Sequence, residues 1–210
     1  MIPRPSNFLI VAMLATLLAI ALTAFFVWRM SGPAPIATVG AVTSTKVATN
    51  VSIGGAFSLI DHTGRAVRDS DFRGRLMLVF FGYGYCPDIC PTELQNIAVA
   101  LDALGADADA VQPLFITVDP ERDTVEFLAE YVPNFHPRLL GLTGQKAQTD
   151  AVAKAYRVYH ARADDQPGED YLVDHSAFTY LMSRDGTYLT MFRAGADPLA
   201  MARAIATYID

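Results

Sequence analysis

The chain of 210 residues contains two cysteines, Cys86 and Cys90, in the segment FGYGYCPDICPTEL. A cysteine thiolate is both a nucleophile and a soft metal ligand, so the pair fits a structural disulfide, a redox couple or a metal site. Two sulfurs on one metal lie roughly 3.8–4.0 Å apart, whereas a disulfide holds them at about 2.05 Å. A spacer of three residues can serve either distance. A domain of about 155 residues buries enough core without a staple, which makes a purely structural disulfide a weak explanation.

Strand and helix patterns alternate along the chain around these cysteines. Continuous apolar runs at 75–83 and 111–119 predict strands buried on both faces, and apolar residues at helical spacing predict a helix at 92–104. The other expected elements are a hairpin at 56–68 turning at Gly64, a helix at 122–132 capped by Asp123 or Thr124, a strand at 138–144, a helix at 145–158 running into an edge strand that ends at His160, a hairpin at 176–195 turning at Asp185-Gly186, and a helix at 197–209.

This order of elements predicts an α/β fold of three layers. A cysteine pair directly after the first buried strand, where the first helix opens, is the thioredoxin-like arrangement, here with an added N-terminal β-hairpin. Pro91 predicts that Cys90 lies at the boundary between turn and helix. There the unpaired backbone N–H groups and the positive end of the helix dipole favour the thiolate. Redox chemistry and metal binding both use the thiolate, so the position alone does not separate them.

Two sulfurs suit a soft ion, Cu(I) above all, but they do not complete its coordination. The chain offers four histidines, and an isolated histidine is more often structural: His62, His136, His160 and His175. His175 is the candidate ligand, because we expect it in a late loop, immediately before a strand, and thioredoxin-like folds bring this loop over the start of the cysteine-bearing helix. We expect Asp174 or Asp119 to orient its second ring nitrogen, as metal-bound histidines require. A structural zinc site would want a fourth protein ligand, and the sequence places none.

The N-terminal end of the chain has the composition of a membrane anchor. Residues 8–28 carry no charge, and a helix of that length spans a bilayer core of about 30 Å. Trp28 and Arg29 suit the interface that would follow. We expect a stub and transmembrane helix at 1–30, a flexible tether at 31–52 and a folded domain at 53–210. The short N-terminus favours a single-pass protein of the bacterial inner membrane with its C-terminal domain in the periplasm.

All 22 acidic residues of the chain follow residue 60. The same part of the chain contains 13 basic residues, so the domain carries a net charge of −9. This balance argues against a nucleic acid partner, whose phosphates require basic surfaces. An acidic surface more often serves solubility than recognition. We give the same interpretation to the acidic run Asp164, Asp165, Glu169 and Asp170, rather than a docking role.

Three motifs of the domain together resemble the Sco/SenC family of membrane-anchored copper chaperones for cytochrome c oxidase assembly. They are GYGYCPDICPTEL, FITVDPERDT and DYLVDHSAFTYLM, in this order along the chain. The GYGY ahead of Cys86 is a variation on the expected motif. The resemblance implies a thioredoxin-like domain that binds one copper ion, Cu(I) or Cu(II), through Cys86, Cys90 and His175. It also implies an upstream periplasmic copper donor and delivery to the binuclear copper site of the oxidase subunit.

Other functions remain open on the same residues. A membrane-tethered thiol–disulfide oxidoreductase would use Cys86 and Cys90 to reduce the target's copper-site cysteines, and it would not need His175. A copper or redox sensor would use the same three ligands. A peroxidase of this fold would attack peroxide with Cys86, but we find no arginine clearly placed to stabilise that thiolate.

Overall fold

The computed structural model describes residues 17–18, 20–25, 52–163 and 171–209. The chain divides into two compact units, Met1–Thr49 and Asn50–Asp210. In the first unit, residues 17–18 and 20–25 are helical. Within the described residues, no helix is both long and apolar enough to cross a membrane. Most of the predicted anchor and tether, and the acidic run between 164 and 170, lie outside the described residues.

A seven-stranded sheet forms the centre of the second unit, in the order β2-β1-β5-β4-β3-β8-β9. Strands β3, β4 and β5 are parallel, whereas β1 and β2 on one side and β8 and β9 on the other are antiparallel. Every residue of β3 and β4 is buried, as their apolar sequences predict. The strands are β1 (Ser58–Asp61), β2 (Ala66–Arg68), β3 (Leu76–Gly82), β4 (Val111–Thr117), β5 (Leu140–Thr143), β8 (Phe178–Met182) and β9 (Tyr188–Arg193).

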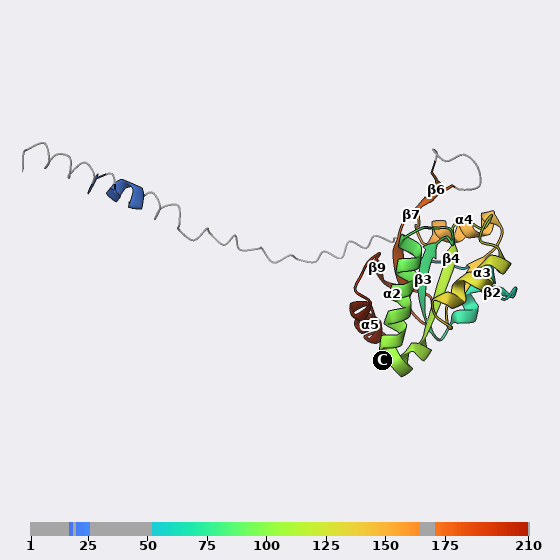
Figure 1. Ribbon diagram of the computed structural model, residues 1–210. Coiled ribbons are helices and arrows are strands. Elements are labelled where there is room, and N and C mark those ends of the chain that lie inside the picture. Colours follow the sequence, from blue (N-terminus) through green and yellow to red (C-terminus); the bar gives the residue numbers. More distant parts are fainter. Residues whose placement is uncertain (1–16, 19, 26–51, 164–170, 210) are drawn as a thin grey trace, which may run out of the picture. The chain divides into compact units, whose positions relative to one another are not determined.

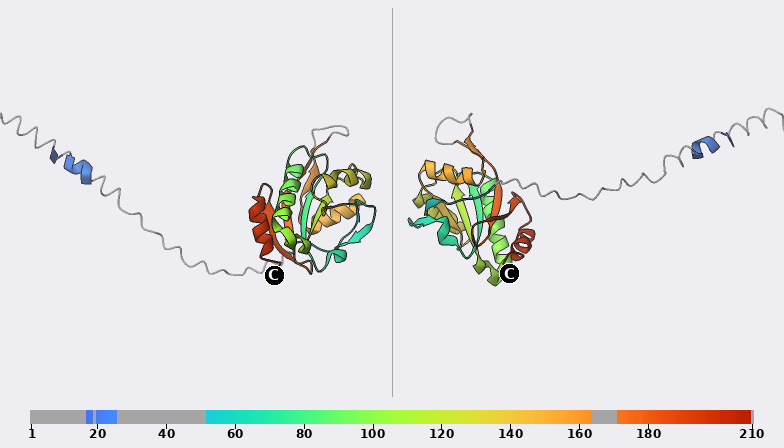
Figure 2. Two further views of the ribbon diagram at one scale, coloured as in Figure 1. Left: turned by 60° about the horizontal axis from the view of Figure 1, so that its bottom comes forward. Right: turned by 180° about the vertical axis from the view of Figure 1, so that it is seen from behind.

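Helices cover both faces of this sheet, which gives the predicted three layers (Figure 1). Helices α2 and α5 pack side by side on one face, and α3 and α4 lie on the other (Figure 2). The helices are α2 (Ile89–Leu104), α3 (Val125–Tyr131), α4 (Lys146–Ala155) and α5 (Pro198–Ala206), with short 3-10 turns at Asp69–Phe72, Gly105–Ala110 and Val132–Asn134. Thr124 caps α3, since its side chain accepts the backbone N–H of Phe127, and Asp197 caps α5 in the same way through Leu199.

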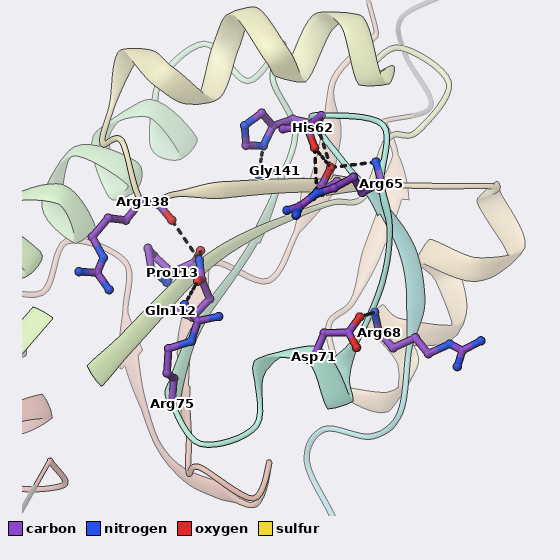
Figure 3. Close-up of polar contacts among 11 residues, drawn as sticks. His62, Arg65, Arg68, Asp71, Arg75, Gln112, Pro113, Arg138 and Gly141 are labelled. Carbon is purple, nitrogen blue, oxygen red and sulfur yellow. Dashed lines mark hydrogen bonds and ion pairs between the residues drawn. The ribbon is translucent and has the colours of Figure 1, made fainter. Parts of the chain in front are cut away.

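The predicted N-terminal hairpin is formed by β1 and β2, and it extends the sheet beyond β5. Pro113 lies in the central strand β4, where a missing N–H is normally costly. Pairing between β4 and β5 begins only at Leu114, after the proline. The side-chain amide of the preceding Gln112 instead donates to the carbonyl oxygens of Arg138 and Pro113, at 3.0 and 3.1 Å (Figure 3). This side chain therefore replaces a ladder contact at the entry of the strand.

Three local predictions were wrong. The edge strand that was expected to end at His160 instead begins at this residue. Helix α2 begins at Ile89, three residues before the expected start, so Cys90 lies inside its first turn. Pro91 is tolerated there because the first turn has no internal partner for its missing N–H. His175 does not lie in a loop but ends a strand, β7 (Val173–His175), which pairs with β6 (His160–Arg162) in a separate two-stranded sheet. We call β6 and β7 together the arm; it projects from the end of the domain where α2 begins (Figure 1).

The end of β3 packs directly against the first turn of α2 at Gly82. A Cβ atom at this position would lie 2.8 Å from the Cys90 Sγ, 3.0 Å from the Phe115 ring and 3.1 Å from the Phe80 ring. Real Cβ atoms essentially never come that close, and each of these neighbours is fully buried. The absence of a side chain at Gly82 thus sets the position of the Cys90 sulfur.

We expect Gly82→Ala to cost about 1–3 kcal/mol of unfolding free energy, because its methyl group must displace a packed ring or the sulfur. Chemical denaturation followed by circular dichroism measures this cost. Gly55→Ala is the matched control, since its Cβ would meet only Ala155 at an ordinary 3.5 Å. Equal effects of the two substitutions would contradict the packing argument.

Candidate metal centre

The structure brings Cys86, Cys90 and His175 together, although 85 residues separate Cys90 from His175. One ligand atom from each lies within 4.8 Å of the other two. The Cys90 Sγ lies 3.4 Å from the His175 Nε2. Both cysteines are free thiols, Cys86 half-buried and Cys90 buried. The sequence predicted these three residues as one site, and the arm and the start of α2 supply the geometry.

Cys86 lies just before α2, and its sulfur takes the place of a capping side chain. The backbone N–H of Cys90 points at the Cys86 Sγ at 3.5 Å, while Asp88 at the N-cap position makes no side-chain cap. The pKa of Cys86 is lowered well below its usual range, chiefly by a hydrogen bond from the Cys90 thiol, and further by backbone N–H groups. Donation to Cys86, together with burial, raises the pKa of Cys90. The pair therefore holds one thiolate at Cys86 and one proton at Cys90.

The imidazole of His175 is oriented by the backbone carbonyl of the next residue. Its Nδ1 lies 3.2 Å from the carbonyl oxygen of Ser176. Because a carbonyl only accepts, Nδ1 carries the proton, and the lone pair of Nε2 points toward the sulfurs. The rings of Phe80 and Tyr83 meet the imidazole edge-on, with centroids at 6.4 and 5.9 Å. The ring thus presents the nitrogen that a metal would use.

Neither aspartate expected to orient His175 contacts it among the described residues. Asp174 is exposed and adjacent to His175 in β7, and adjacent residues of a strand point to opposite faces. The Asp119 carboxylate instead accepts the Tyr171 hydroxyl at 2.7 Å and the Arg122 Nε at 2.6 Å. The carbonyl of Ser176 occupies the orienting position, and sequence patterns give no signal for a backbone acceptor.

The three remaining histidines have structural partners. The Nδ1 of His62 accepts the backbone N–H of Gly141 at 3.2 Å (Figure 3). The Nδ1 of His136 accepts the N–H of Arg138 at 3.1 Å. His160 pairs with His175 across the arm, but its Nε2 faces Asp150 at 3.5 Å. These contacts agree with the interpretation, made from the sequence, that the three histidines are structural residues.

Asp123 lies beneath the cysteine loop, a role the sequence analysis missed by considering it only as a helix cap. It is fully buried. Its carboxylate accepts the Thr117 hydroxyl at 2.6 Å and the Gly84 N–H at 3.0 and 3.1 Å. A Cβ at Gly84 would lie 2.1 Å from the ring of Phe127. Asp123 therefore fixes the backbone two residues before Cys86, in a position where only glycine fits.

The donor set suits a soft monovalent ion. Two sulfurs and one imidazole nitrogen match the preference of Cu(I) for thiolate and imidazole ligands, and they leave no oxygen donor for Mg²⁺ or Ca²⁺. A thiolate at Cys86 is ready to bind, and metal binding would release the proton held by Cys90. The same thiols can also exchange with a disulfide, because Cys86 is the more accessible and less basic sulfur.

Comparison with known proteins places these residues in a family. Residues 45–210 match the model of the SCO1/SenC family. The chain is 44% identical over 159 residues to the protein sco1 of Schizosaccharomyces pombe, covering 74% of this chain and 60% of that protein. It is 52% identical over 136 residues to the mitochondrial SCO2 homologue of Bos taurus, covering 64% of this chain and 51% of that protein. The chain thus matches only about half to three fifths of the length of these curated relatives.

Solved structures give the same result. The chain resembles Bradyrhizobium japonicum ScoI with copper bound, at 43% identity and a TM-score of 0.70, covering 75% of this chain and 99% of that one. It resembles yeast Sco1 with copper bound at 39% identity and a TM-score of 0.70, covering 75% and 88%. These likenesses confirm the predicted thioredoxin-like fold and the family resemblance that the three motifs suggested.

The buried carboxyl of Asp123 should give the stability a distinctive pH dependence. Burial raises its pKa from 3.8 to about 6, against the lowering effect of the Thr117 and Gly84 hydrogen bonds. A raised carboxyl pKa means that the folded state holds the proton more tightly than the unfolded state. The stabilisation is therefore full below about pH 4 and is lost as the pH rises through about 6.

We expect the unfolding free energy of the wild type, relative to Asp123→Asn, to fall by on the order of 1–2 kcal/mol between pH 4.5 and pH 7.5. Thermal or urea unfolding at both pH values measures the difference. The exposed Asp107→Asn serves as control, for which the difference should not vary. A constant difference for Asp123→Asn would contradict the burial of a titrating carboxyl.

Proposed function

The chain belongs to the SCO1/SenC family, and on that premise we propose that it is a copper metallochaperone. One copper ion binds through Cys86, Cys90 and His175 and is delivered to the binuclear copper site of cytochrome c oxidase during assembly. The observation that carries the proposal is the convergence of two thiols and one imidazole nitrogen within 4.8 Å. A peroxidase or a structural disulfide would have no use for that imidazole.

Transfer follows from the way the ligands are held. Cys90 is buried in the first turn of α2, and Cys86 lies half-buried beside it. His175 belongs to the arm, which has no strand pairing with the main sheet. The arm therefore moves more easily than the helix. Release of the imidazole opens a coordination position while the two sulfurs retain the ion, and thiolates of the acceptor then exchange in one at a time.

The partners on both sides of this transfer belong to the proposal. An upstream periplasmic copper donor loads the site, and the copper-site subunit of cytochrome c oxidase receives the ion. Cu(I) fits the three donors without a further ligand, whereas Cu(II) prefers a fourth donor in a more tetragonal geometry. The site thus favours loading with Cu(I), with Cu(II) as an accessible oxidised form.

A second candidate function is reduction of the acceptor's copper-site cysteines. The low pKa of Cys86 and the buried, protonated Cys90 form the asymmetric pair that thiol–disulfide exchange requires. Cys86 attacks the acceptor disulfide, and Cys90 then resolves the mixed disulfide as the pair itself becomes oxidised. This activity needs no imidazole, so His175 separates the two functions.

An anaerobic Cu(I) titration of the reduced protein against a competing chromophoric chelator tests the copper site. The wild type should bind one tight equivalent. Cys86→Ser and His175→Ala should each lower the copper affinity by more than about 100-fold, because removing a ligand lowers metal affinity more than removing a residue that hydrogen-bonds to a ligand. His136→Ala is the matched control and should bind like the wild type. Weak binding that is insensitive to His175 would favour the reductase instead.

We further propose that residues 1–30 anchor the protein in the bacterial inner membrane, that 31–52 form a tether, and that 53–210 form the domain in the periplasm. In cell fractionation the protein should stay with the membranes after alkaline extraction. Protease added to spheroplasts should remove the domain, whereas deletion of residues 1–30 should remove the membrane association. Protection of the domain in spheroplasts would contradict this topology.

A further inference from the structure

The GYGY segment ahead of Cys86 contains a hydroxyl that the function proposed above does not use. Tyr83 directly follows β3 and is only 2% exposed. Its oxygen accepts the backbone N–H of Val173 at 3.2 Å. Val173 opens β7, the strand that ends in His175. A phenylalanine at position 83 would fill the same space without this contact.

The bond matters because few polar contacts join the arm to the body of the domain. The arm forms its own two-stranded sheet. Among the described hydrogen bonds, the Tyr83 hydroxyl holds the start of β7, and the Tyr171 hydroxyl, just before β7, donates to Asp119 at 2.7 Å. The Tyr171 ring also receives the guanidinium of Arg122, 3.6 Å from its centroid. Besides the contact between the Cys90 sulfur and the His175 ring, the Tyr83 bond is the described hydrogen bond from the body of the domain that reaches β7 itself.

The ring of Tyr83 also faces the histidine of the site. Its centroid lies 5.9 Å from that of the His175 imidazole, at an interplanar angle of 85°. One side chain therefore contacts both the histidine ring and the backbone of the strand that carries it.

We propose that Tyr83 is a positioning residue that seats the arm, so that the His175 nitrogen reaches the two sulfurs. The inference rests on the proposed copper site and concerns how firmly that site holds its ion. With the hydroxyl present, the arm returns to the closed arrangement after each opening. Without it, the imidazole spends more time away from the sulfurs, and the ion leaves faster. Tyr83 contacts the His175 ring and the strand that carries it but does not itself bind the ion.

The test uses Tyr83→Phe, which removes the oxygen and keeps the ring, in the full-length protein in detergent micelles. The first measurement needs no metal: amide hydrogen exchange of Val173, followed by NMR in the reduced protein. Loss of one buried hydrogen bond should speed this exchange about five- to tenfold. Tyr156→Phe is the matched control, since Tyr156 is also buried and no described hydrogen bond joins its hydroxyl to β7. It should leave Val173 exchange unchanged.

The second measurement is a double-mutant cycle on copper retention. Tyr83→Phe should raise the Cu(I) dissociation rate about five- to tenfold when His175 is present. In the His175→Ala background the same substitution should change the dissociation rate by less than about twofold, because the arm then carries no copper ligand and its position no longer affects the ion. A hydroxyl with a merely structural role would act equally in both backgrounds.

The outcomes separate this inference from the function on which it rests. Unchanged exchange at Val173, or an equal effect of Tyr83→Phe with and without His175, overturns the seating role. If the wild type retained Cu(I) no better than His175→Ala, the copper site itself would fail. The exchange at Val173 would then still show whether the hydroxyl holds the arm.

Discussion

The contact between the last residue of β3 and the first turn of α2 governs the rest of this site. Gly82 has no side chain, so the sulfur of Cys90 lies against the sheet with Phe80 and Phe115 around it. That packing fixes where the helix begins, and the helix start in turn points the N–H of Cys90 at the Cys86 sulfur. Donation of the Cys90 thiol to Cys86, together with the burial of Cys90, thus determines which thiol is ionised and which stays protonated.

Buried polar groups hold the segments around this contact, namely the cysteine loop, the start of β7 and helix α2. Asp123 holds the backbone of the cysteine loop through Gly84, and Tyr83 holds the start of β7. Glu93, buried in α2, accepts the Thr179 hydroxyl at 3.1 Å and the Gly195 N–H at 3.0 Å, which joins the helix to β8 and to the turn before α5. The helix is therefore bound on both sides, whereas in the arm the Tyr83 hydroxyl holds β7 and His160 of β6 faces Asp150 of α4. Stability is concentrated under the sulfurs and not under the imidazole.

Sequence patterns predicted the three layers and the two strands buried on both faces, and they singled out Cys86, Cys90 and His175 as candidate ligands. These features depend on apolar periodicity and on chemically rare side chains. The patterns failed where one residue type has several uses. Asp123 was predicted as a possible helix cap, although Thr124 caps α3 and Asp123 is buried beneath the cysteine loop. The start of α2 was placed too late because proline normally marks a boundary. The arm was missed because two three-residue strands leave almost no periodic signal.

The tight packing at Gly82 also determines which oxidation products Cys86 and Cys90 can form. Conversion of a thiol to a sulfinic or sulfonic acid adds oxygen atoms that need space around the sulfur. Cys90 is fully buried, and even a single added Cβ atom at Gly82 would lie only 2.8 Å from its sulfur. A disulfide with Cys86 adds no atoms, so it is the oxidised form that this packing permits. Irreversible oxidation is therefore open to Cys86 and not to Cys90. Cys86 escapes it whenever the disulfide with Cys90 closes first.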